Sequence, residues 1–370
     1  MNRRTFLKLS ATLPAVSAMS QMPGVLSIAR AQQRDFNPRP GAWRAYEITT
    51  RVEVLKPTGV TRVWVPLPVV DADYQKPQAS TWSGNAKVIE PATDPQYGAG
   101  MLYAEWSADE KAPLLEVVSR FQTQDRAFDV SKKTPARLDA AVARKWTQPT
   151  DLMPTDGIVR DTADEITQGK RSDLEKVQAI YDWILAITYR DPKVRGCGVG
   201  DIKAMLETKN FGGKCADLNG LFVGLSRAAG VPARDIYGIR VAPSAFGYKA
   251  LGAGSANISK AQHCRAEAFL QDYGWVAMDP ADVAKVAREE TSEWLKIDHP
   301  VVAVVRPKLF GGWEGNWVAY NVAHDVKLPH AQAGKVAFLM YPQAETAEGR
   351  RDSLDPETFR YTIATRVLGA

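Results

Sequence analysis

The most regular apolar pattern in the chain covers residues 215–229. Apolar side chains recur there every three or four residues, which is the spacing of a helix with one buried face. They are Leu218, Leu221, Phe222, Leu225 and Ala229. Gly230 and Pro232 follow at once, and these residue types end helices because glycine accepts a left-handed cap and proline cannot continue the helix. The pattern predicts a buried helix whose first turn contains Cys215.

A second helix is predicted shortly before the first. Ser172 and Glu175 have the spacing of a capping box, in which each side chain accepts a backbone amide at the start of a helix. The apolar positions that follow at helical spacing are Val177, Ile180, Tyr181, Ile184 and Ile187. We expect this helix to pack against the Cys215 helix.

Strand-like alternation dominates both ends of the chain. From about residue 43 to residue 128, apolar residues occupy alternate positions in several runs that prolines and glycines separate. Beyond Pro300, β-like runs return at residues 301–305, 317–322, 336–341 and 359–367. The pattern predicts an α+β protein. Its expected parts are an N-terminal β domain at residues 36–130, a core at 155–295 and a C-terminal β subdomain at 300–370.

Composition and charge narrow the class of protein. The chain has 370 residues, of which 45% are hydrophobic and 24% charged, as in ordinary globular proteins. Four of its 47 basic residues lie in the first 31 positions, which hold no acid, so 43 basic residues remain against 42 acidic ones. This near-neutral remainder argues against a nucleic-acid-binding protein, which would carry a concentrated positive charge.

The first 31 residues resemble a twin-arginine export signal. Arg3 and Arg4 precede a mildly apolar stretch rich in alanine and serine, and Ala29-Arg30-Ala31 offers a cleavage site after Ala31. Serines and prolines interrupt the stretch before it reaches the roughly eighteen apolar residues that span a membrane. We therefore expect a signal peptide at residues 1–31 and a periplasmic mature protein without stable membrane insertion.

The chain has three cysteines, Cys197, Cys215 and Cys264. This number is too small for a disulfide scaffold, and an odd count leaves one thiol free. Cys197 and Cys264 could pair, a point that the sequence leaves open. Cys215 is the candidate nucleophile, because the unpaired amides and the helix dipole at a helix start favour a thiolate. The alternative is a buried cysteine that only packs.

His263 is the candidate base for this thiol. Residues 262–270 alternate as a strand, which places His263 and Cys264 on opposite faces and argues against a metal site that uses both. A turn at residues 271–274 and a return strand that ends at proline would bring Asp279 back toward the histidine. A carboxylate there would orient the imidazole. Asp282 is the rival, because sequence alone does not determine the strand register.

Four motifs together resemble the transglutaminase-like superfamily of papain-related thiol enzymes. In the family's order, they are Gly213-Lys-Cys215, Gly230-Val-Pro-Ala-Arg234, His263-Cys-Arg-Ala-Glu267 and Gly274-Trp-Val-Ala-Met-Asp279-Pro280. The resemblance covers about residues 155–295. It implies a papain-like core, with a buried nucleophile helix packed on an antiparallel sheet. Arg265 stands where the family usually has tryptophan, which alters the aromatic wall of the acyl pocket and favours a polar or acidic substrate.

The resemblance also implies roles for three residues. Cys215 would be the nucleophile, His263 the general base and acid, and Asp279 the orienting carboxylate. The expected activity is that of an exported cysteine peptidase or amidase, which forms an acyl-enzyme from an amide or peptide carbonyl and releases it to water. A protein cross-linking acyltransferase and a non-catalytic binding or scaffold protein are the alternatives.

Cofactors and metals are not expected. The sequence has no phosphate-binding glycine loop and no closely spaced pairs of cysteine and histidine ligands. The expected partner is a peptide or protein substrate, and a cell-wall peptide fits the predicted compartment.

Overall fold

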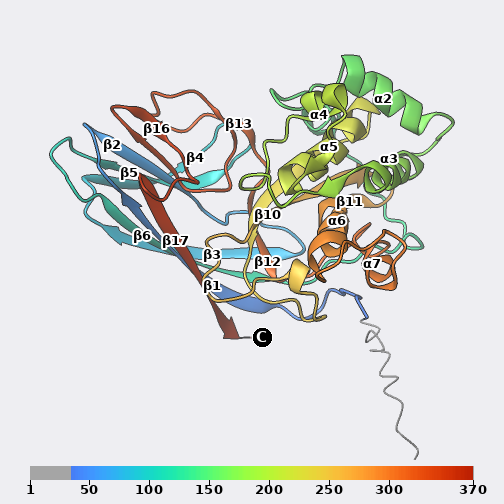
Figure 1. The fold of residues 1–370 in the computed structure, drawn as a ribbon, viewed down its shortest axis with the longest axis horizontal. Helices are drawn as coiled ribbons and strands as arrows, with labels where there is room; N and C mark the ends of the chain where they lie inside the picture. Colours follow the sequence, from blue (N-terminus) through green and yellow to red (C-terminus); the bar gives the residue numbers. More distant parts are fainter. Residues whose placement is uncertain (1–34, 370) are drawn as a thin grey trace, which may run out of the picture. The chain divides into compact units, whose positions relative to one another are not determined.

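Three antiparallel sheets of four or five strands organise residues 35–369, the part of the chain that the computed structural model describes (Figure 1). The export signal predicted for residues 1–31 lies outside this range. Every helix between residues 35 and 369 is too short or too polar to cross a bilayer.

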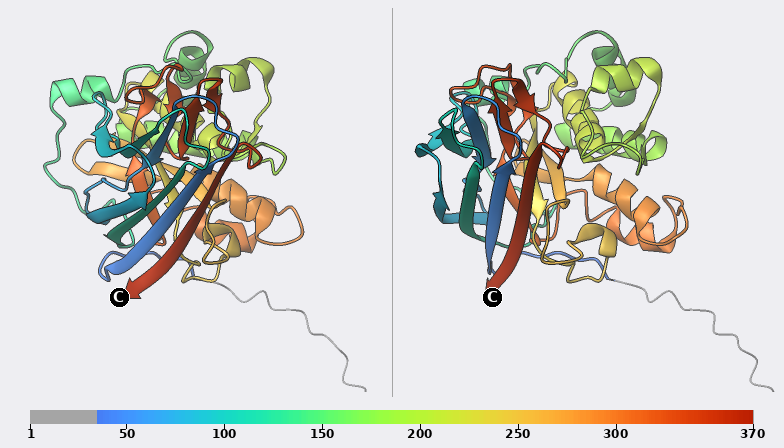
Figure 2. Two further views of the ribbon diagram at one scale, coloured as in Figure 1. Left: turned by 90° about the vertical axis from the view of Figure 1, so that its left-hand side faces the viewer. Right: turned by 60° about the vertical axis from the view of Figure 1, so that its left-hand side comes forward.

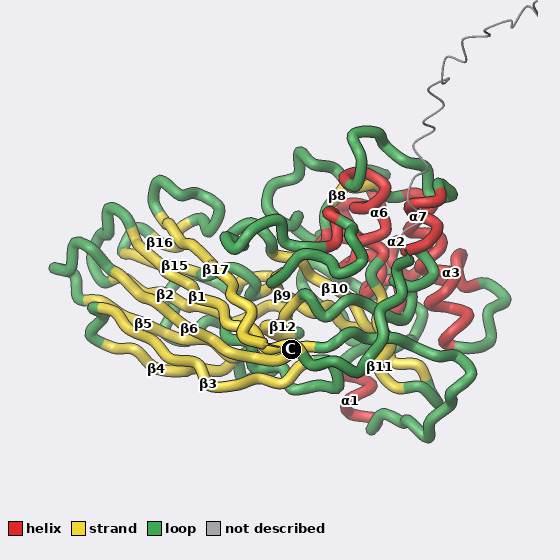
Figure 3. Tube along the Cα trace, turned by 90° about the horizontal axis from the view of Figure 1, so that it is seen from below, coloured by secondary structure: helices red, strands yellow, loops and turns green. Residues whose placement is uncertain are grey.

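Two of the sheets pack face to face. The first contains, in spatial order, β17 (Phe359–Gly369), β1 (Arg44–Val54), β6 (Leu114–Thr123) and β3 (Gln75–Gly84). The second contains β16 (Gly349–Arg351), β15 (Gln343–Thr346), β2 (Thr61–Pro66), β5 (Gly100–Trp106) and β4 (Val88–Thr93). Alternate apolar side chains of β1, β2, β5 and β6 meet between the sheets in one buried cluster. Figure 3 shows these yellow strands on one side and the red helices on the other.

Strands from the two ends of the chain pair directly. β17 runs antiparallel to β1, with Tyr361 opposite Val52, and β15 pairs with β2. Figure 2 shows the red β17 beside the blue β1. Each of these two sheets therefore contains strands from both β regions of the sequence. Local strand patterns do not specify which strands become neighbours, so they did not predict this pairing.

The third sheet carries the histidine strand. Its strands are, in spatial order, β11 (Gly274–Met278), β10 (Gln262–Leu270), β9 (Ala233–Arg240) and β12 (Trp317–Asn321). The hairpin predicted from the sequence is confirmed, with Ala266 opposite Met278. Positive φ angles of 71° at Asp272 and 87° at Gly274 form its turn. Side chains of β9 and β12 meet those of β1 and β6 in a shared apolar cluster.

Helices pack against this sheet, and α5 contacts both β10 and β9. The longer ones are α2 (Gly157–Thr167), α3 (Asp173–Ile187), α4 (Ile202–Thr208), α5 (Cys215–Ala228) and α6 (Pro280–Glu289). The predicted capping box is confirmed, because Ser172 Oγ accepts the amide of Glu175 at 3.2 Å and Glu175 Oε2 accepts that of Ser172 at 2.8 Å. α3 and α5 share one buried apolar cluster, as expected.

The remaining elements are short. They are α1 (Ala140–Lys145), the 3-10 helix η1 (Lys249–Leu251), β7 (Tyr189–Arg190), β8 (Gly212–Gly213), β13 (His324–Val326) and β14 (Val336–Phe338). β8 pairs with β7 in parallel and leads directly into α5. This pairing holds the chain in place immediately before Cys215.

The expectation of a strand at residues 301–305 is wrong. These residues belong to helix α7 (Pro300–Val305), which begins where His299 Nδ1 accepts the amide of Val301 at 3.3 Å. Val302 and Val305 are buried in the helical core. The run of valines favours a strand locally. Proline at the first helical position and burial of one valine face outweigh the small helix-propensity cost of valine.

Candidate active site

Cys215 is the first residue of α5 and is only 3% exposed. Lys214 precedes it in an extended conformation as the N-cap residue. Asp217 lies in the first turn and accepts the backbone amide of Lys214 at 2.9 Å, which closes the start of the helix. The thiol therefore lies at a helix start, where backbone amides without intrahelical partners and the helix dipole favour a negative charge.

A glycine-rich loop, residues 196–200, is held against the first turn of α5. Asp217 Oδ1 accepts two backbone amides of the loop, both at 2.9 Å, and α5 donates an amide to the carbonyl of Cys197, also at 2.9 Å. Gly198 has a φ angle of +92°, and a Cβ atom there would lie 1.9 Å from the Asp217 carboxylate. The loop therefore needs glycine at this position, and it brings Cys197 close to Cys215.

His263 lies on β10 and faces two carboxylates. Its Nε2 atom is 2.9 Å from Asp279 Oδ2 and 3.3 Å from Asp282 Oδ1. Asp279 is the N-cap residue of α6, so Asp282 follows one helical turn later on the same side. Both sequence candidates thus reach the same ring nitrogen, and Asp279 is the nearer one. Both carboxylates face Nε2, and the imidazole also interacts with the Cys215 thiol.

Asn219 connects the nucleophile helix to the carboxylate, a link that sequence reasoning missed. Its Nδ2 atom is 3.2 Å from Asp279 Oδ1 and 2.8 Å from the carbonyl oxygen of Cys264. Its Oδ1 atom accepts the amide of Ala281 at 3.1 Å. The signal in the sequence is a polar residue four positions after Cys215, and it turns out to be fully buried. Such a residue needs hydrogen-bond partners, but the pattern does not say which.

The electrostatics favour a charged pair. Burial disfavours a charged imidazole, yet the two carboxylates outweigh it and raise the pKa of His263 to about 9. Interactions with the thiols of Cys197 and Cys264, together with the contact to His263, hold the pKa of Cys215 well below its ordinary value despite burial. Both shifts favour a protonated imidazole at His263 and a thiolate at Cys215.

His263, Asp279 and Asp282 are also the described residues that lie close enough together to hold a metal ion. Two arginines already face this cluster. Arg240 Nη2 donates to Asp282 Oδ1, and Arg265 Nε lies 3.5 Å from Asp279 Oδ2. Burial would raise the pKa of Asp282, but the Arg240 guanidinium holds it well below its usual value. Protein side chains thus supply the positive charge that a cation would bring.

All three cysteines are free and buried. The pairing of Cys197 with Cys264 that the sequence left open is therefore not formed. The thiol of Cys197 instead donates to the carbonyl oxygen of Gln262 at 3.4 Å. Both thiols interact with Cys215, and their own pKa values are raised by that interaction and by burial.

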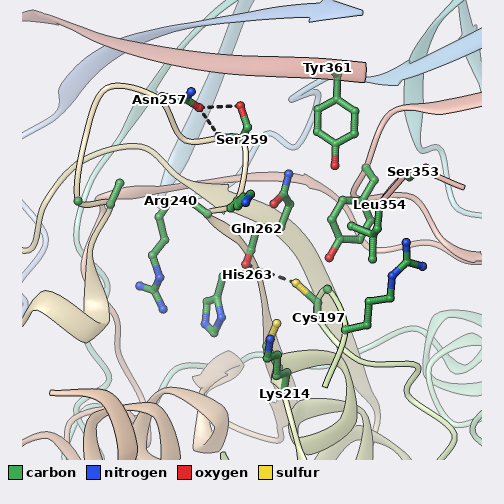
Figure 4. Close-up of a pocket in the computed structure, with 18 of the residues that line it drawn as sticks. Cys197, Lys214, Arg240, Asn257, Ser259, Gln262, His263, Ser353, Leu354 and Tyr361 are labelled. Atoms are coloured by element: carbon green, nitrogen blue, oxygen red, sulfur yellow. Dashed lines mark hydrogen bonds between the residues drawn. The ribbon is translucent and has the colours of Figure 1, made fainter. Parts of the chain in front are cut away.

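A cavity of about 640 Å³ lies over the charged pair (Figure 4). Cys215 and His263 contribute to its lining, together with residues 196 and 197 of the glycine-rich loop, residues 252–254, 257 and 259–262, and side chains near the C-terminus such as Leu354 and Tyr361. Figure 4 shows His263, Cys197 and Lys214 around the same space. The reactive sulfur is therefore buried among side chains but faces a space that a substrate can enter.

Arg265 does not line this cavity. It is 2% exposed and lies over the rings of Trp317 and Trp313, at 4.6 and 5.0 Å. Its Nη1 atom donates to the carbonyl oxygen of Glu314 at 3.1 Å. The expectation that Arg265 sets the polarity of the acyl pocket is wrong, because its side chain packs behind the carboxylates rather than beside a substrate.

Comparisons with known proteins agree with this architecture. Residues 160–280 match the family model described as "Transglutaminase-like superfamily". An uncharacterised protein of Haemophilus influenzae is 35% identical over 341 residues, which cover 87% of this chain and 91% of the relative. A candidate cysteine protease from Cytophaga hutchinsonii superposes with a TM-score of 0.52 at 13% identity, covering 89% of this chain and 92% of that one, and so shares the fold. The chain belongs to the transglutaminase-like superfamily, a family of thiol enzymes.

Proposed function

We propose that this protein is an enzyme that forms an acyl-enzyme on Cys215 from an amide or peptide carbonyl. The observation that carries the proposal is one connected set of side chains, in which His263 bonds both the Cys215 thiol and Asp279 beneath an open cavity. A cysteine with only a packing role would not need a charged imidazole beside it. This arrangement supports nucleophilic catalysis.

The proposed reaction uses these groups in two steps. The thiolate sulfur of Cys215 attacks the carbonyl carbon, and the backbone amide of Cys215 stabilises the resulting oxyanion. The C–N bond then breaks while His263 gives its proton to the leaving amine, which leaves a thioester. A water molecule gives a proton to His263 and attacks the thioester, so that the C–S bond breaks and the acid is released. Asp279 keeps the imidazole oriented and stabilises its charge.

Hydrolysis is the proposed outcome, as in a cysteine peptidase or amidase. Water far outnumbers amines in the proposed periplasmic compartment, which itself rests on the twin-arginine motif of the sequence. A peptide or protein substrate, such as a cell-wall peptide, fits that location. The alternative, cross-linking, requires an acceptor amine. Incubating the enzyme and a cleaved peptide with a fluorescent primary amine separates them, because cross-linking would attach the amine to the acyl product.

Alkylation of Cys215 tests the proposal without a known substrate. The rate with iodoacetamide between about pH 5 and pH 9 is measured for the folded protein and for His263→Ala, and mass spectrometry of the Cys215 peptide reports the labelled site. We expect fast labelling at pH 6 that falls at least about tenfold in the variant. His330→Ala, which removes a histidine outside the cavity lining, serves as the matched control.

An ordinary thiol would give the opposite result. Labelling that is slow at pH 6, that rises only near the usual cysteine pKa and that His263→Ala leaves unchanged would show that the charged pair does not form. A binding or scaffold protein with this fold would then be the better explanation.

A further inference from the structure

The charged side chains that line the cavity over Cys215 are basic. Among the described residues, its lining contains no aspartate or glutamate. The basic side chains that line it are Arg190, Arg195, Lys214, Arg240, Lys260 and Lys285. The chain as a whole has nearly equal numbers of basic and acidic residues, so this concentration of positive charge is a local property of the cavity.

The arginines and the lysines of the lining differ in their partners. Each arginine has an acidic partner that lies outside the lining: Arg190 pairs with Glu289 at 2.8 Å, Arg195 with Asp352 at 2.6 Å, and Arg240 with Asp282. The lysines Lys214, Lys260 and Lys285 form no ion pair with any acid between residues 35 and 369. Among the described residues, these three ammonium groups line the cavity without a directly contacting carboxylate.

Among the three lysines, Lys285 gives the strongest evidence that the cavity binds an anionic ligand. It lies on α6, one turn after Asp282, and is partly buried in the cavity wall. Burial and the nearby Arg240 guanidinium lower its pKa to about 8, and they outweigh the opposing effects of Asp282 and Glu289. The surroundings therefore disfavour the charged form of Lys285. A partly buried ammonium without a partner is unfavourable. An anion that enters the cavity would relieve this cost.

Gln262 adds a neutral donor to the same wall. Its Nε2 atom is buried and has no hydrogen-bond partner in the described structure. Figure 4 shows its side chain in the cavity, between Ser259 and His263. A buried amide donor usually has an acceptor, and a carboxylate oxygen of a ligand would provide one.

We propose that this cavity selects acyl donors that carry carboxylate groups, such as acidic peptides, with Lys214 and Lys285 as the specificity-determining cations. The proposal rests on the proposed function, because it names the substrate class of the same site. Carboxylates pair with the free ammonium groups and accept from Gln262. Basic peptides would instead add positive charge to a lining that already has an excess of it.

Two alkylating reagents that differ in one group test the charge selection. Iodoacetate and iodoacetamide transfer similar groups to the Cys215 sulfur, but only iodoacetate is an anion. The ratio of their rates is measured in the wild type, in Lys214→Met and in Lys285→Met, with Lys203→Met as the control for a lysine that pairs with Glu207 outside the cavity. We expect the ratio to fall at least about threefold in each cavity variant and to stay unchanged in the control.

Competition gives a second readout that does not depend on the variants folding. N-acetyl-tetraglutamate should slow the labelling of wild-type Cys215 by iodoacetamide, and N-acetyl-tetraglutamine at the same concentration and ionic strength should not. Added salt should weaken this protection by screening.

The two ways of failing are distinguishable. Slow labelling by both reagents that does not respond to His263→Ala contradicts the proposed function itself. Fast labelling that depends on His263, with the same reagent ratio in all variants and equal protection by the two peptides, overturns the charge selection and leaves the acyl-enzyme proposal in place.

Discussion

Replacing Cys215 with alanine should make the free energy of unfolding depend on pH between 6.5 and about 9. In the wild type, Cys215 and His263 together should contribute no pH dependence in this range. In that range, folded His263 holds a proton that its unfolded form has lost. Because the pKa of folded Cys215 lies well below its ordinary value, we expect folded Cys215 to have lost a proton that the unfolded thiol still holds. The two differences cancel, because folding then binds and releases one proton each. Alanine removes the contribution of the thiol and leaves that of the histidine.

The size of the effect follows from the pKa of His263. It rises from 6.5 to about 9 on folding, and each pKa unit corresponds to about 1.4 kcal/mol. A raised pKa gives stability that is fully present below pH 6.5 and is lost as the pH rises through about 9. The free energy of unfolding of Cys215→Ala should therefore fall by about 3 kcal/mol relative to wild type across this range.

Urea denaturation followed by tryptophan fluorescence measures this difference at about pH 6, 7, 8 and 9. Subtracting the wild-type curve removes the titration of all other groups. The double variant His263→Ala/Cys215→Ala is the control, and it should lose the pH dependence that the single variant shows. Parallel curves for wild type and Cys215→Ala would refute the reasoning, because they would mean that the thiol and the imidazole are both neutral in the folded protein.

Three further predictions concern the support of the site, and urea denaturation checks each of them. Asn219→Ala should cost about 2 kcal/mol of stability and slow the alkylation of Cys215, because it removes three buried hydrogen bonds; unchanged values would show that Asp279 is held without it. Glu267→Gln should cost about 3 kcal/mol, because two arginines lose their shared, fully buried carboxylate; a neutral effect would contradict this. Gly198→Ala should cost about 2 kcal/mol through its positive φ and its contact with a carboxylate. Gly254→Ala, where a Cβ meets nothing within 4 Å, should be nearly neutral, and equal costs would argue against a strained loop.

The elements that carry the site were predictable because their signals are local. The apolar spacing from Leu218 to Ala229 and the Gly230 cap mark the α5 helix. The turn before Gly274 and the alternation around His263 mark the hairpin. Turns, caps and amphipathic faces depend on residues a few positions apart, so a single sequence is enough to recognise them. The run of valines in α7 shows the limit, since its cap and its burial overrode the preference of the residues for strands.

Contacts between distant segments were not predictable. Strand β17 pairs with β1 across more than three hundred residues, and nothing in either strand names the other. The same holds for Asn219, which bonds Asp279 sixty positions later. The choice between Asp279 and Asp282 also depended on tertiary structure, because the hairpin register and the start of α6 together place both carboxylates on one imidazole nitrogen.

The sequence by itself determined the kind of chemistry available, through a cysteine at a helix start, a histidine on a strand and an aspartate after its partner strand. It also determined the family, through the order of four short motifs. Only the tertiary structure decided the environment of these groups: the thiols around Cys215, the burial of Arg265 away from the cavity, and the lysines that line the same cavity as Cys215. The physical reason is that charge, burial and hydrogen bonding at a site are set by side chains from many segments, and only the folded chain brings those segments together.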